Sequence, residues 1–478
     1  MKHYTRFQLF GFIIAPLILI FMLLLENPSS MNNTAWKTAS VGLLLAVLWI
    51  TEALPIYVTA LLPIIFFPIL EVNGIKEATA PYAHPLIFLF LGGFILAEGI
   101  QKWGLHRRIA LSIINLIGFS PKNIIAGFMI GSAFLSMWIS NTATTLMMLP
   151  IGLFVVSVYK DAANSDRTKV KKFTIALMLS IAYSSSIGGV GTLIGTPPNA
   201  LLAAFMSDTY NIDISFAEWM MVGIPLVFVS IPVLFLLLTK VLFPIHKMEE
   251  IDETLFRQEL DSIGKISNEE KKVLVVFIIT ASLWMSRIFL SNLIPGLSDA
   301  GIAIFGALLL FFIPAKEGSP LLVWKDVQKI AWGILLLFGG GLSLAQAIKT
   351  SGLADWIAVS ILNSGEYPVL LLIFLLTTAI VFLTELTSNL ATTAAFLPVI
   401  GSVAVGLNVN PLEFVIPVAM AASCAFMLPV ATPPNAIIFS SGELKIKDMS
   451  RAGLLLNLVF ILIVIFISQV VGKFAFGY

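Results

Sequence analysis

Long apolar stretches, separated by short polar segments, recur along the whole chain. About 20 consecutive apolar residues are enough for a helix to cross a bilayer. The pattern predicts eleven such crossings. We expect them at residues 7–25, 38–56, 57–70, 85–101, 173–207, 218–243, 273–290, 299–314, 331–349, 411–440 and 452–473.

Two further apolar regions, 123–159 and 369–407, are too long for a single crossing and are interrupted near the middle by polar residues. This pattern is typical of a helical hairpin that enters and leaves the membrane on the same side. The sequence therefore predicts an all-α polytopic membrane protein with about eleven transmembrane helices and two re-entrant hairpins. The apolar run 7–25 is longer than the core of a secretion signal and no small-residue cleavage site follows it, so we interpret it as the first transmembrane helix.

The distribution of positive charge fits one orientation of this topology. With the N-terminus in the cytoplasm and the C-terminus outside, nearly all of the 28 Lys and Arg residues fall in cytoplasmic segments, as the positive-inside rule expects. The exceptions are Lys37, Lys76, Arg287, Lys349 and Lys473. The compact loops suggest a bacterial inner membrane.

The two halves of the chain repeat one another. Three motifs occur in the same order in each half: Phe-x-Gly-Gly, Ser-Asn-x-Ala-Thr-Thr and Thr-Pro-Pro-Asn-Ala. They lie at residues 90–93 and 338–341, 140–145 and 388–393, and 196–200 and 432–436. Three ordered matches at nearly constant spacing indicate an internal duplication.

The number of crossings predicts how the two halves are oriented. Residues 38–243 form a first repeat and residues 273–478 a second, after an N-terminal helix and outer loop in residues 1–37 and with a cytoplasmic linker at 244–272. Five expected crossings in each repeat, an odd number, turn the second upside down relative to the first. Transporters with inverted repeats bind their substrate near the membrane midplane, where the repeats meet.

Polar residues cluster at the turn of each expected hairpin. Ser136 and the segment 140–142 form one cluster, and Thr384 and the segment 387–389 form the other. Non-helical backbone at membrane depth must line a cavity or be buried in protein. A hairpin tip exposes N–H groups, which suit an anion, and C=O groups, which suit Na⁺ together with hydroxyl and amide oxygens. The alternative is that these residues join helices by hydrogen bonds across the bundle.

Each half also contains a helix that must be broken. The segments 188–199 and 429–435 both end in Thr-Pro-Pro-Asn, and two consecutive prolines cannot continue a helix. Broken helices at matching positions of two repeats point to a transport site, whereas the simpler interpretation is a structural kink. A nucleotide-binding loop is excluded because the glycines of the first segment lack the lysine and the strand–helix context of that motif.

Charged residues inside the expected spans are few, chiefly Glu52, Glu98 and Glu385, and no Lys or Arg lies at the centre of a span. An anion would therefore be held by helix N-termini, hydroxyls and amides, with its charge balanced by bound cations. Glu385 is either a proton-coupling group or a hydrogen-bonded structural carboxylate behind the hairpin tip.

Composition narrows the class of protein further. Hydrophobic residues make up 58% of the 478 residues and charged residues 12%, whereas a soluble chain carries about 25% charged residues. A net charge of +1 gives no field that would attract nucleic acid, so we expect no nucleic-acid partner. One cysteine, Cys424, and four scattered histidines give neither a disulfide framework nor a metal cluster.

The paired Ser-Asn motifs, the two Thr-Pro-Pro-Asn segments and the inverted repeat together resemble the divalent anion–sodium symporter family. This family includes Na⁺/dicarboxylate and Na⁺/citrate cotransporters and related dicarboxylate exchangers. The resemblance covers essentially the whole chain. It implies a homodimer in the lipid bilayer, whose eleven-helix protomers each have a scaffold domain and a transport domain that moves like an elevator.

The resemblance also implies two Na⁺ sites and one anion site. One Na⁺ site would use Ser136, Ser140, Asn141 and the backbone near Gly195. The other would use Thr384, Thr387, Asn389 and the backbone near Ala431. The anion would contact residues of both hairpin tips and both broken helices, namely Ser140, Asn141, Thr142, Thr196, Pro197, Ser388, Asn389, Thr432 and Pro433.

The chain departs from the family pattern at one position of the second tip. The motif normally reads Ser-Asn-Thr, and its threonine is Leu390 here. An apolar side chain replaces a hydroxyl that would contact a carboxylate, which puts the usual preference for C4-dicarboxylates in question. The residues expected to hold Na⁺ are not affected.

We therefore predict a Na⁺-coupled importer of small carboxylate anions such as succinate, malate, fumarate or citrate, and no enzyme. A Na⁺-independent dicarboxylate exchanger and a sulfate transporter are the nearest alternatives. An intramembrane enzyme would need paired aspartates or a His pair for a metal inside the spans, and the sequence offers neither. A passive channel would have to pass ions far faster than a transporter turns over.

Overall fold

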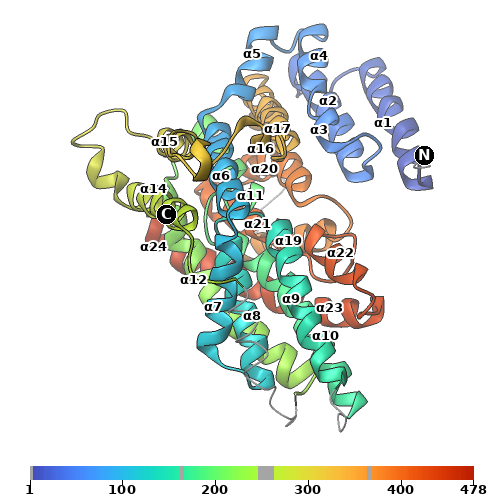
Figure 1. Cartoon of the computed structure of the whole chain (residues 1–478). Coiled ribbons are helices and arrows are strands. Elements are labelled where there is room, and N and C mark those ends of the chain that lie inside the picture. Colours follow the sequence, from blue (N-terminus) through green and yellow to red (C-terminus); the bar gives the residue numbers. More distant parts are fainter. Residues whose placement is uncertain (1–3, 29, 162–165, 246–262, 363–367) are drawn as a thin grey trace.

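The structure, a computed structural model, describes residues 4–28, 30–161, 166–245, 263–362 and 368–478. This part of the chain is built from helices (Figure 1) and contains no β-strand, only an isolated bridge between Pro314 and Pro320. Nine helices within it are long and apolar enough to cross a membrane. The predicted all-α, multi-pass membrane fold is confirmed, while the count of eleven crossings stays a prediction.

The first half of the chain begins with two long helices that pack on one another. It ends with a long helix that continues as a short π-helix. Its helices are α1 (Arg6–Leu24), α2 (Asn33–Thr51), α3 (Ile56–Thr59), α4 (Leu62–Ile69), α5 (Ile75–Thr79), η1 (Ala80–Ala83), α6 (Pro85–Lys102), α7 (Leu105–Ile117), α8 (Pro121–Ser136), α9 (Asn141–Asp161), α10 (Arg167–Gly189), α11 (Pro197–Tyr210), α12 (Phe216–Leu236) and its π-helical continuation η2 (Leu237–Leu242).

The second half repeats the order of helices found in the first half. Its helices from residue 332 onward correspond to the helices from residue 85 onward. Its helices are α14 (Asn268–Leu290), α15 (Asp299–Phe312), η3 (Lys316–Gly318), α16 (Trp324–Val327), α17 (Trp332–Thr350), α18 (Leu353–Leu362), α19 (Val369–Thr384), α20 (Asn389–Gly406), α21 (Pro411–Ala422), α22 (Pro433–Ser440), α23 (Ile446–Ile467), the π-helical η4 (Ser468–Gly472) and α24 (Lys473–Phe476).

The polar interruptions predicted from the sequence fall between helices. Residues 137–140 join α8 to α9 and residues 385–388 join α19 to α20, so each expected hairpin is a helix–turn–helix pair. The two long spans predicted to be broken are non-helical over residues 190–196 and 423–432. Entry and exit of the hairpins on one side of the membrane, and the inverted orientation of the two halves, stay predictions.

Two predicted boundaries differ from the structure. The span expected at 57–70 consists of two short helices, α3 and α4. The expected cytoplasmic linker 244–272 is shorter, because α14 already begins at Asn268. The Ser267 hydroxyl accepts a hydrogen bond from the Glu270 amide, and the Glu270 carboxylate accepts one from the Ser267 amide, a capping box that starts a helix there. Residues 246–262 of that linker lie outside the described residues.

The repeated Gly-Gly motif explains how the halves pack together. Gly92 on α6 lies so close to the backbone of Ala303 on α15 that a Cβ would overlap it, and Gly340 on α17 lies equally close to Ala60, between α3 and α4. In each case the helix that carries the Gly-Gly motif of one half contacts one of the first helices of the other half. The hairpins cross over in the same way, since α9 packs against α22 and α20 packs against α11.

Candidate functional site

Four helices begin at the residues singled out by the repeat. These helices are α9, which starts at Asn141, α11 at Pro197, α20 at Asn389 and α22 at Pro433. The first turn of a helix leaves backbone N–H groups without an intrahelical partner and carries a partial positive charge. Since α9 packs on α22 and α20 on α11, each hairpin helix that begins at a motif residue packs on a broken helix of the other half. Such an arrangement favours an anion without any Lys or Arg side chain.

The first hairpin tip brings together oxygen atoms from three segments. The Ser136 hydroxyl, fully buried at the end of α8, lies 2.6 Å from the terminal atom of the Asn141 amide. The same amide atom lies 3.2 Å from the carbonyl oxygen of Ser185 and 3.3 Å from that of Gly195. Gly195 belongs to the unwound segment between α10 and α11. The predicted grouping of Ser136, Asn141 and the backbone near Gly195 is therefore found.

This geometry admits two arrangements of the Asn141 amide. With its NH₂ toward the cluster, the amide donates to the oxygens around it. With its oxygen toward the cluster, one hydroxyl, one amide oxygen and two carbonyl oxygens face one another, which is unfavourable unless a cation lies among them. Oxygen ligands of this mixture are the ones that hard cations prefer, and unwound backbone carbonyls are Na⁺ ligands in transporters with broken helices.

The second hairpin tip repeats this arrangement with a threonine in place of Ser136. The Thr384 hydroxyl lies 2.8 Å from Asn389 Oδ1 and 2.9 Å from the carbonyl oxygen of Ala422. A hydroxyl has one proton to donate, so it can satisfy only one of these two acceptors at a time. A cation among the three oxygens would satisfy both acceptors, which makes the tip a second candidate Na⁺ site.

Three predicted Na⁺ ligands make other contacts. The Thr387 hydroxyl lies 2.6 Å from that of Thr392 and 2.9 Å from the Leu383 carbonyl. The Ser140 hydroxyl is exposed and accepts a hydrogen bond from the Ala143 amide at 3.2 Å, so it caps α9. The amide of Ala431 donates to the Leu428 carbonyl at 3.2 Å. The structure does not bring these three groups into contact with either amide cluster.

Sequence reasoning missed two backbone carbonyls and two asparagines. The carbonyl oxygens of Ser185 and Ala422 belong to the amide clusters described above, and a carbonyl leaves no side-chain signal. The buried amides of Asn199 and Asn435, the last residues of the two Thr-Pro-Pro-Asn motifs, hold the unwound segments in shape. The presence of an asparagine at the same position of both motifs was a signal that could have identified these two residues.

The two asparagine amides bind equivalent carbonyls. Asn199 Nδ2 donates to the carbonyls of Gly189, Val190 and Thr192 at 2.7–3.2 Å. Asn435 Nδ2 donates to the carbonyls of Ala425 and Leu428 at 3.0–3.1 Å. These carbonyls belong to the end of α10 and to the two unwound segments. Two of them also accept from a second donor, the Val190 carbonyl from the indole of Trp219 and the Leu428 carbonyl from the backbone N–H of Ala431. Both asparagines therefore position the backbone that faces the hairpin tips.

Glu385 is a structural carboxylate in this arrangement. Its oxygens accept hydrogen bonds from the backbone amides of Phe426, Met427 and Leu428 at 2.7–3.0 Å. The Asn457 amide on α23 donates to it at 2.7 Å. Four hydrogen bonds from two different segments hold this buried group in place, which favours the structural one of the two roles expected for Glu385.

The residues predicted to contact the anion differ in accessibility. Thr142, Pro197, Ser388 and Asn389 are partly exposed, and Pro433 is exposed. Thr196 and Thr432 are buried and are the N-caps of α11 and α22. The Thr432 hydroxyl accepts a hydrogen bond from the backbone N–H of Asn435. No described contact tests their role, so the anion site stays a prediction.

The departure at Leu390 has a structural counterpart. Leu390 is buried among the hydrophobic residues of the core, whereas the equivalent Thr142 of the first tip is half-buried. The apolar side chain has therefore become part of the packing beneath the second tip. Only the first tip offers a partly exposed hydroxyl at this motif position.

The described residues contain no group of three or more His, Cys, Asp or Glu that could hold a metal ion. A cation at the hairpin tips would therefore have only neutral oxygens as ligands. Na⁺ fits such a donor set, because it binds backbone carbonyl and hydroxyl oxygens in broken-helix transporters.

Comparison with known proteins places the chain in a family. The family described as "Sodium:sulfate symporter transmembrane region" matches residues 7–477. A protein of Staphylococcus saprophyticus named sodium-dependent dicarboxylate transporter SdcS is 41% identical, over 98% of this chain and 92% of its own length. The protein of the same name from Staphylococcus aureus strain USA300 is 41% identical, over 100% of this chain and 93% of its own length.

Two solved structures share the fold at low sequence identity. The Alcanivorax borkumensis YdaH transporter has a TM-score of 0.56 at 11% identity and covers 99% of this chain and 97% of its own. Neisseria gonorrhoeae MtrF has a TM-score of 0.58 at 12% identity and covers 97% of this chain and 94% of its own. The family match and the relatives, which are transporters by name rather than enzymes, confirm the resemblance seen in the motifs: the chain is a multi-pass membrane protein that belongs to the divalent anion–sodium symporter family.

Proposed function

We propose that this protein is a Na⁺-coupled symporter of dicarboxylate anions. The observation that carries the proposal is the duplicated cluster of neutral oxygens, with the Asn141 amide beside Ser136 and two carbonyls, and the Asn389 amide beside Thr384 and one carbonyl. Two clusters that lack cationic side chains are suited to bind cations and, through them, an anion. The names of the two relatives, sodium-dependent dicarboxylate transporters, support the same coupling ion and substrate class.

The proposed mechanism begins with Na⁺. Each Na⁺ satisfies oxygens that cannot all be paired by protons and fixes the start of α9 or α20. The fixed helix N-termini, with their free N–H groups, then bind the carboxylates of the substrate. Empty tips have no net positive charge, so they bind the anion poorly. Succinate, malate, fumarate and citrate are the proposed substrates.

The finer parts of the proposal concern movement and assembly. The hairpins and broken helices would form a transport domain that moves like an elevator against the remaining helices, in a homodimer. The family resemblance supports both. Cross-linking of cysteine pairs between α6 and α11, which pack on each other here, would restrain such a movement and lower uptake if the domain slides.

The test is uptake of succinate and citrate into proteoliposomes with an inward Na⁺ gradient, repeated with K⁺ in place of Na⁺. We expect uptake only with Na⁺, and loss of uptake in Asn141→Ala and Asn389→Ala. Uptake that ignores Na⁺ but requires internal dicarboxylate would instead make the protein an exchanger and remove the Na⁺ assignments.

Sulfate is the second candidate substrate, because the family model that matches the chain is described as a sodium:sulfate symporter region. Direct competition separates the two possibilities, because excess sulfate would block succinate uptake only if both anions share the site. Sulfate uptake that succinate fails to inhibit would contradict the dicarboxylate assignment.

A further inference from the structure

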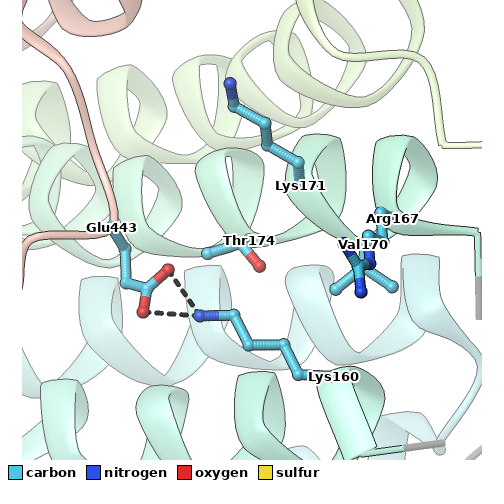
Figure 2. A pocket seen from close by; sticks show the side chains of 6 residues that line it. All are labelled: Lys160, Arg167, Val170, Lys171, Thr174 and Glu443. Carbon is cyan, nitrogen blue, oxygen red and sulfur yellow. Dashed lines mark hydrogen bonds and ion pairs between the residues drawn. The ribbon is translucent and has the colours of Figure 1, made fainter.

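A second group of charged residues lies at the far end of α9 from the hairpin tip (Figure 2). A cavity of about 310 Å³ there is bounded by α9, by α10 and by the segment that joins α22 to α23. It is lined by Lys160, Arg167, Val170, Lys171, Thr174 and Glu443. None of these residues belongs to the candidate transport site.

The lining is electropositive, with three cationic side chains and one carboxylate. The Lys160 ammonium contacts both oxygens of Glu443, at 2.7 and 2.8 Å. The two side chains are 47% and 26% exposed, so the pair is solvated and weak. Arg167 and Lys171 have no carboxylate partner within the described part of the chain. An anion in the cavity would therefore find positive charge that Glu443 does not neutralise.

Thr174 is an independent sign of a ligand. Its side chain is 2% exposed, and its hydroxyl has no hydrogen-bond partner among the described residues. A threonine inside a helix usually donates to the carbonyl of the preceding turn, and Thr174 does not. Figure 2 shows its oxygen directed into the space between Lys160 and Arg167. A ligand oxygen at this point would satisfy a buried hydroxyl that otherwise has no acceptor or donor among the described residues.

We propose that this cavity binds a phosphate group, carried by a small soluble phosphate compound or by the headgroup of an anionic lipid. A phosphate offers several strong acceptor oxygens to the guanidinium fork of Arg167, the ammonium group of Lys160 and the Thr174 hydroxyl. The ammonium of Lys171 is directed away from these groups (Figure 2). The N-terminus of α10 contributes little, because the Asp166 carboxylate already accepts from the Thr168 amide. This end of the molecule carries the loop 160–172 predicted to be cytoplasmic, where anionic lipids attract basic segments.

Phosphate binding would also act on Glu443. A phosphate on Lys160 competes with the Glu443 carboxylate and releases the segment that follows α22. Because α22 begins at the Thr432-Pro433 motif, the cavity is connected to the transport site through one short helix. Substitution of Glu443 by Gln removes the competing charge, so Glu443→Gln is expected to bind phosphate several-fold more tightly than the wild type.

The test uses the full-length protein in phosphatidylcholine nanodiscs, in choline chloride without Na⁺. The proposed transport site is then empty, so failure of this proposal is separate from failure of Na⁺-coupled transport. Titration with glycerol 3-phosphate by calorimetry should give saturable binding that is weakened about tenfold or more in Lys160→Gln/Arg167→Gln, because charge-assisted hydrogen bonds are lost. Thr174→Val keeps the shape and charge of the cavity but should weaken binding several-fold.

The matched control is Lys445→Gln/Lys447→Gln, which removes the same charge outside the cavity and should change affinity less than about twofold. Nanodiscs with part of the phosphatidylcholine replaced by phosphatidylglycerol distinguish the two sources. If the ligand is a lipid headgroup, this lipid raises the melting temperature of the wild type but not of Lys160→Gln/Arg167→Gln, and it suppresses glycerol 3-phosphate binding. Equal weakening in the control variant, or no specific response to either probe, would overturn the proposal.

Discussion

The two halves share a motif asparagine that holds the unwound segment in shape, but the other partners of the two segments differ. In the first half the segment 190–196 follows a glycine-rich helix end, and neutral donors satisfy its carbonyls, among them the Asn199 amide and the indole of Trp219. In the second half the segment 423–432 contacts the carboxylate of Glu385, which accepts three of its backbone N–H groups. Equivalent backbone is therefore built from unlike side chains.

The two halves also differ at the helix end that faces the hairpin tip, where only the first half has a glycine. In the first half Gly189 lies against the Asn141 amide so closely that a Cβ would overlap it. The position 236 residues later is Ala425, which already carries a Cβ. The first tip thus depends on close backbone approach, whereas the second depends on a buried, hydrogen-bonded carboxyl group. We therefore expect each tip to lose its structure when its own feature is removed, the close approach at Gly189 or the carboxyl group of Glu385. Removal of the feature of the other half should have little effect on it.

The largest effect is expected from Glu385→Ala. The substitution leaves three backbone N–H groups and the Asn457 amide without their acceptor, and each buried donor left unsatisfied costs about 1–3 kcal/mol. We expect a large drop in melting temperature, followed by intrinsic fluorescence in detergent, and no uptake.

Glu385→Gln separates the structural role from proton coupling. The glutamine keeps one acceptor oxygen and the side-chain shape, so part of the stability and the Na⁺-driven uptake should remain. A variant that is as stable as the wild type but has lost a pH dependence of uptake would contradict the structural role.

The next effect concerns Gly189→Ala. The new methyl group displaces the Asn141 amide, and overpacking of this kind costs about 1–3 kcal/mol. The Na⁺ concentration for half-maximal uptake should rise about tenfold, since about 1.4 kcal/mol corresponds to a factor of ten. The matched change in the second half, Ala425→Gly, should leave this concentration almost unchanged. Equal effects of the two substitutions would remove the contrast between the tips.

A smaller, graded effect is expected from the two motif asparagines. Asn199→Ala frees the carbonyls of Gly189 and Thr192, at a cost of about 1–3 kcal/mol, while the Val190 carbonyl keeps the Trp219 indole. Asn435→Ala frees the carbonyl of Ala425 in a segment that Glu385 still holds, while the Leu428 carbonyl keeps the backbone N–H of Ala431. We expect the first variant to lower Na⁺ affinity several-fold more than the second, measured by Na⁺ titration of uptake. The reverse order would show that Glu385 does not support its segment.

The smallest effect is expected from Leu390→Thr. Because Leu390 is buried in the core, its replacement should change the half-saturating succinate concentration by no more than about twofold. Thr142→Val, at the partly exposed equivalent position, should raise that concentration several-fold. If Leu390→Thr increased the preference for succinate over sulfate, residue 390 would instead contact the anion.

Most of the fold and the core of each tip follow from the sequence because they depend on local signals. Polar residues inside apolar runs locate the turns at 137–140 and 385–388, and the Pro-Pro pairs locate the helix breaks. The contacts that complete the tips are tertiary. The carbonyl of Ala422 and the donors around Glu385 come from segments about 40 residues away in the chain, and no local pattern indicates them.

Thr387 shows a second limit of the sequence. The family resemblance makes it a ligand of the second Na⁺ site, but its hydroxyl is directed to Thr392 in the first turn of α20. Side-chain direction within a tight turn depends on backbone angles that residue type alone does not determine. The same limit applies to Ser140, which caps its own helix.

The central claim is that Na⁺ at the two tips creates the anion site. Calorimetric titration of the purified protein with succinate, in NaCl and then in choline chloride, tests it most directly. The account predicts saturable succinate binding in NaCl, no measurable binding in choline chloride, and loss of binding in NaCl for both Asn141→Ala and Asn389→Ala. Succinate affinity that is equal in the two salts would contradict it.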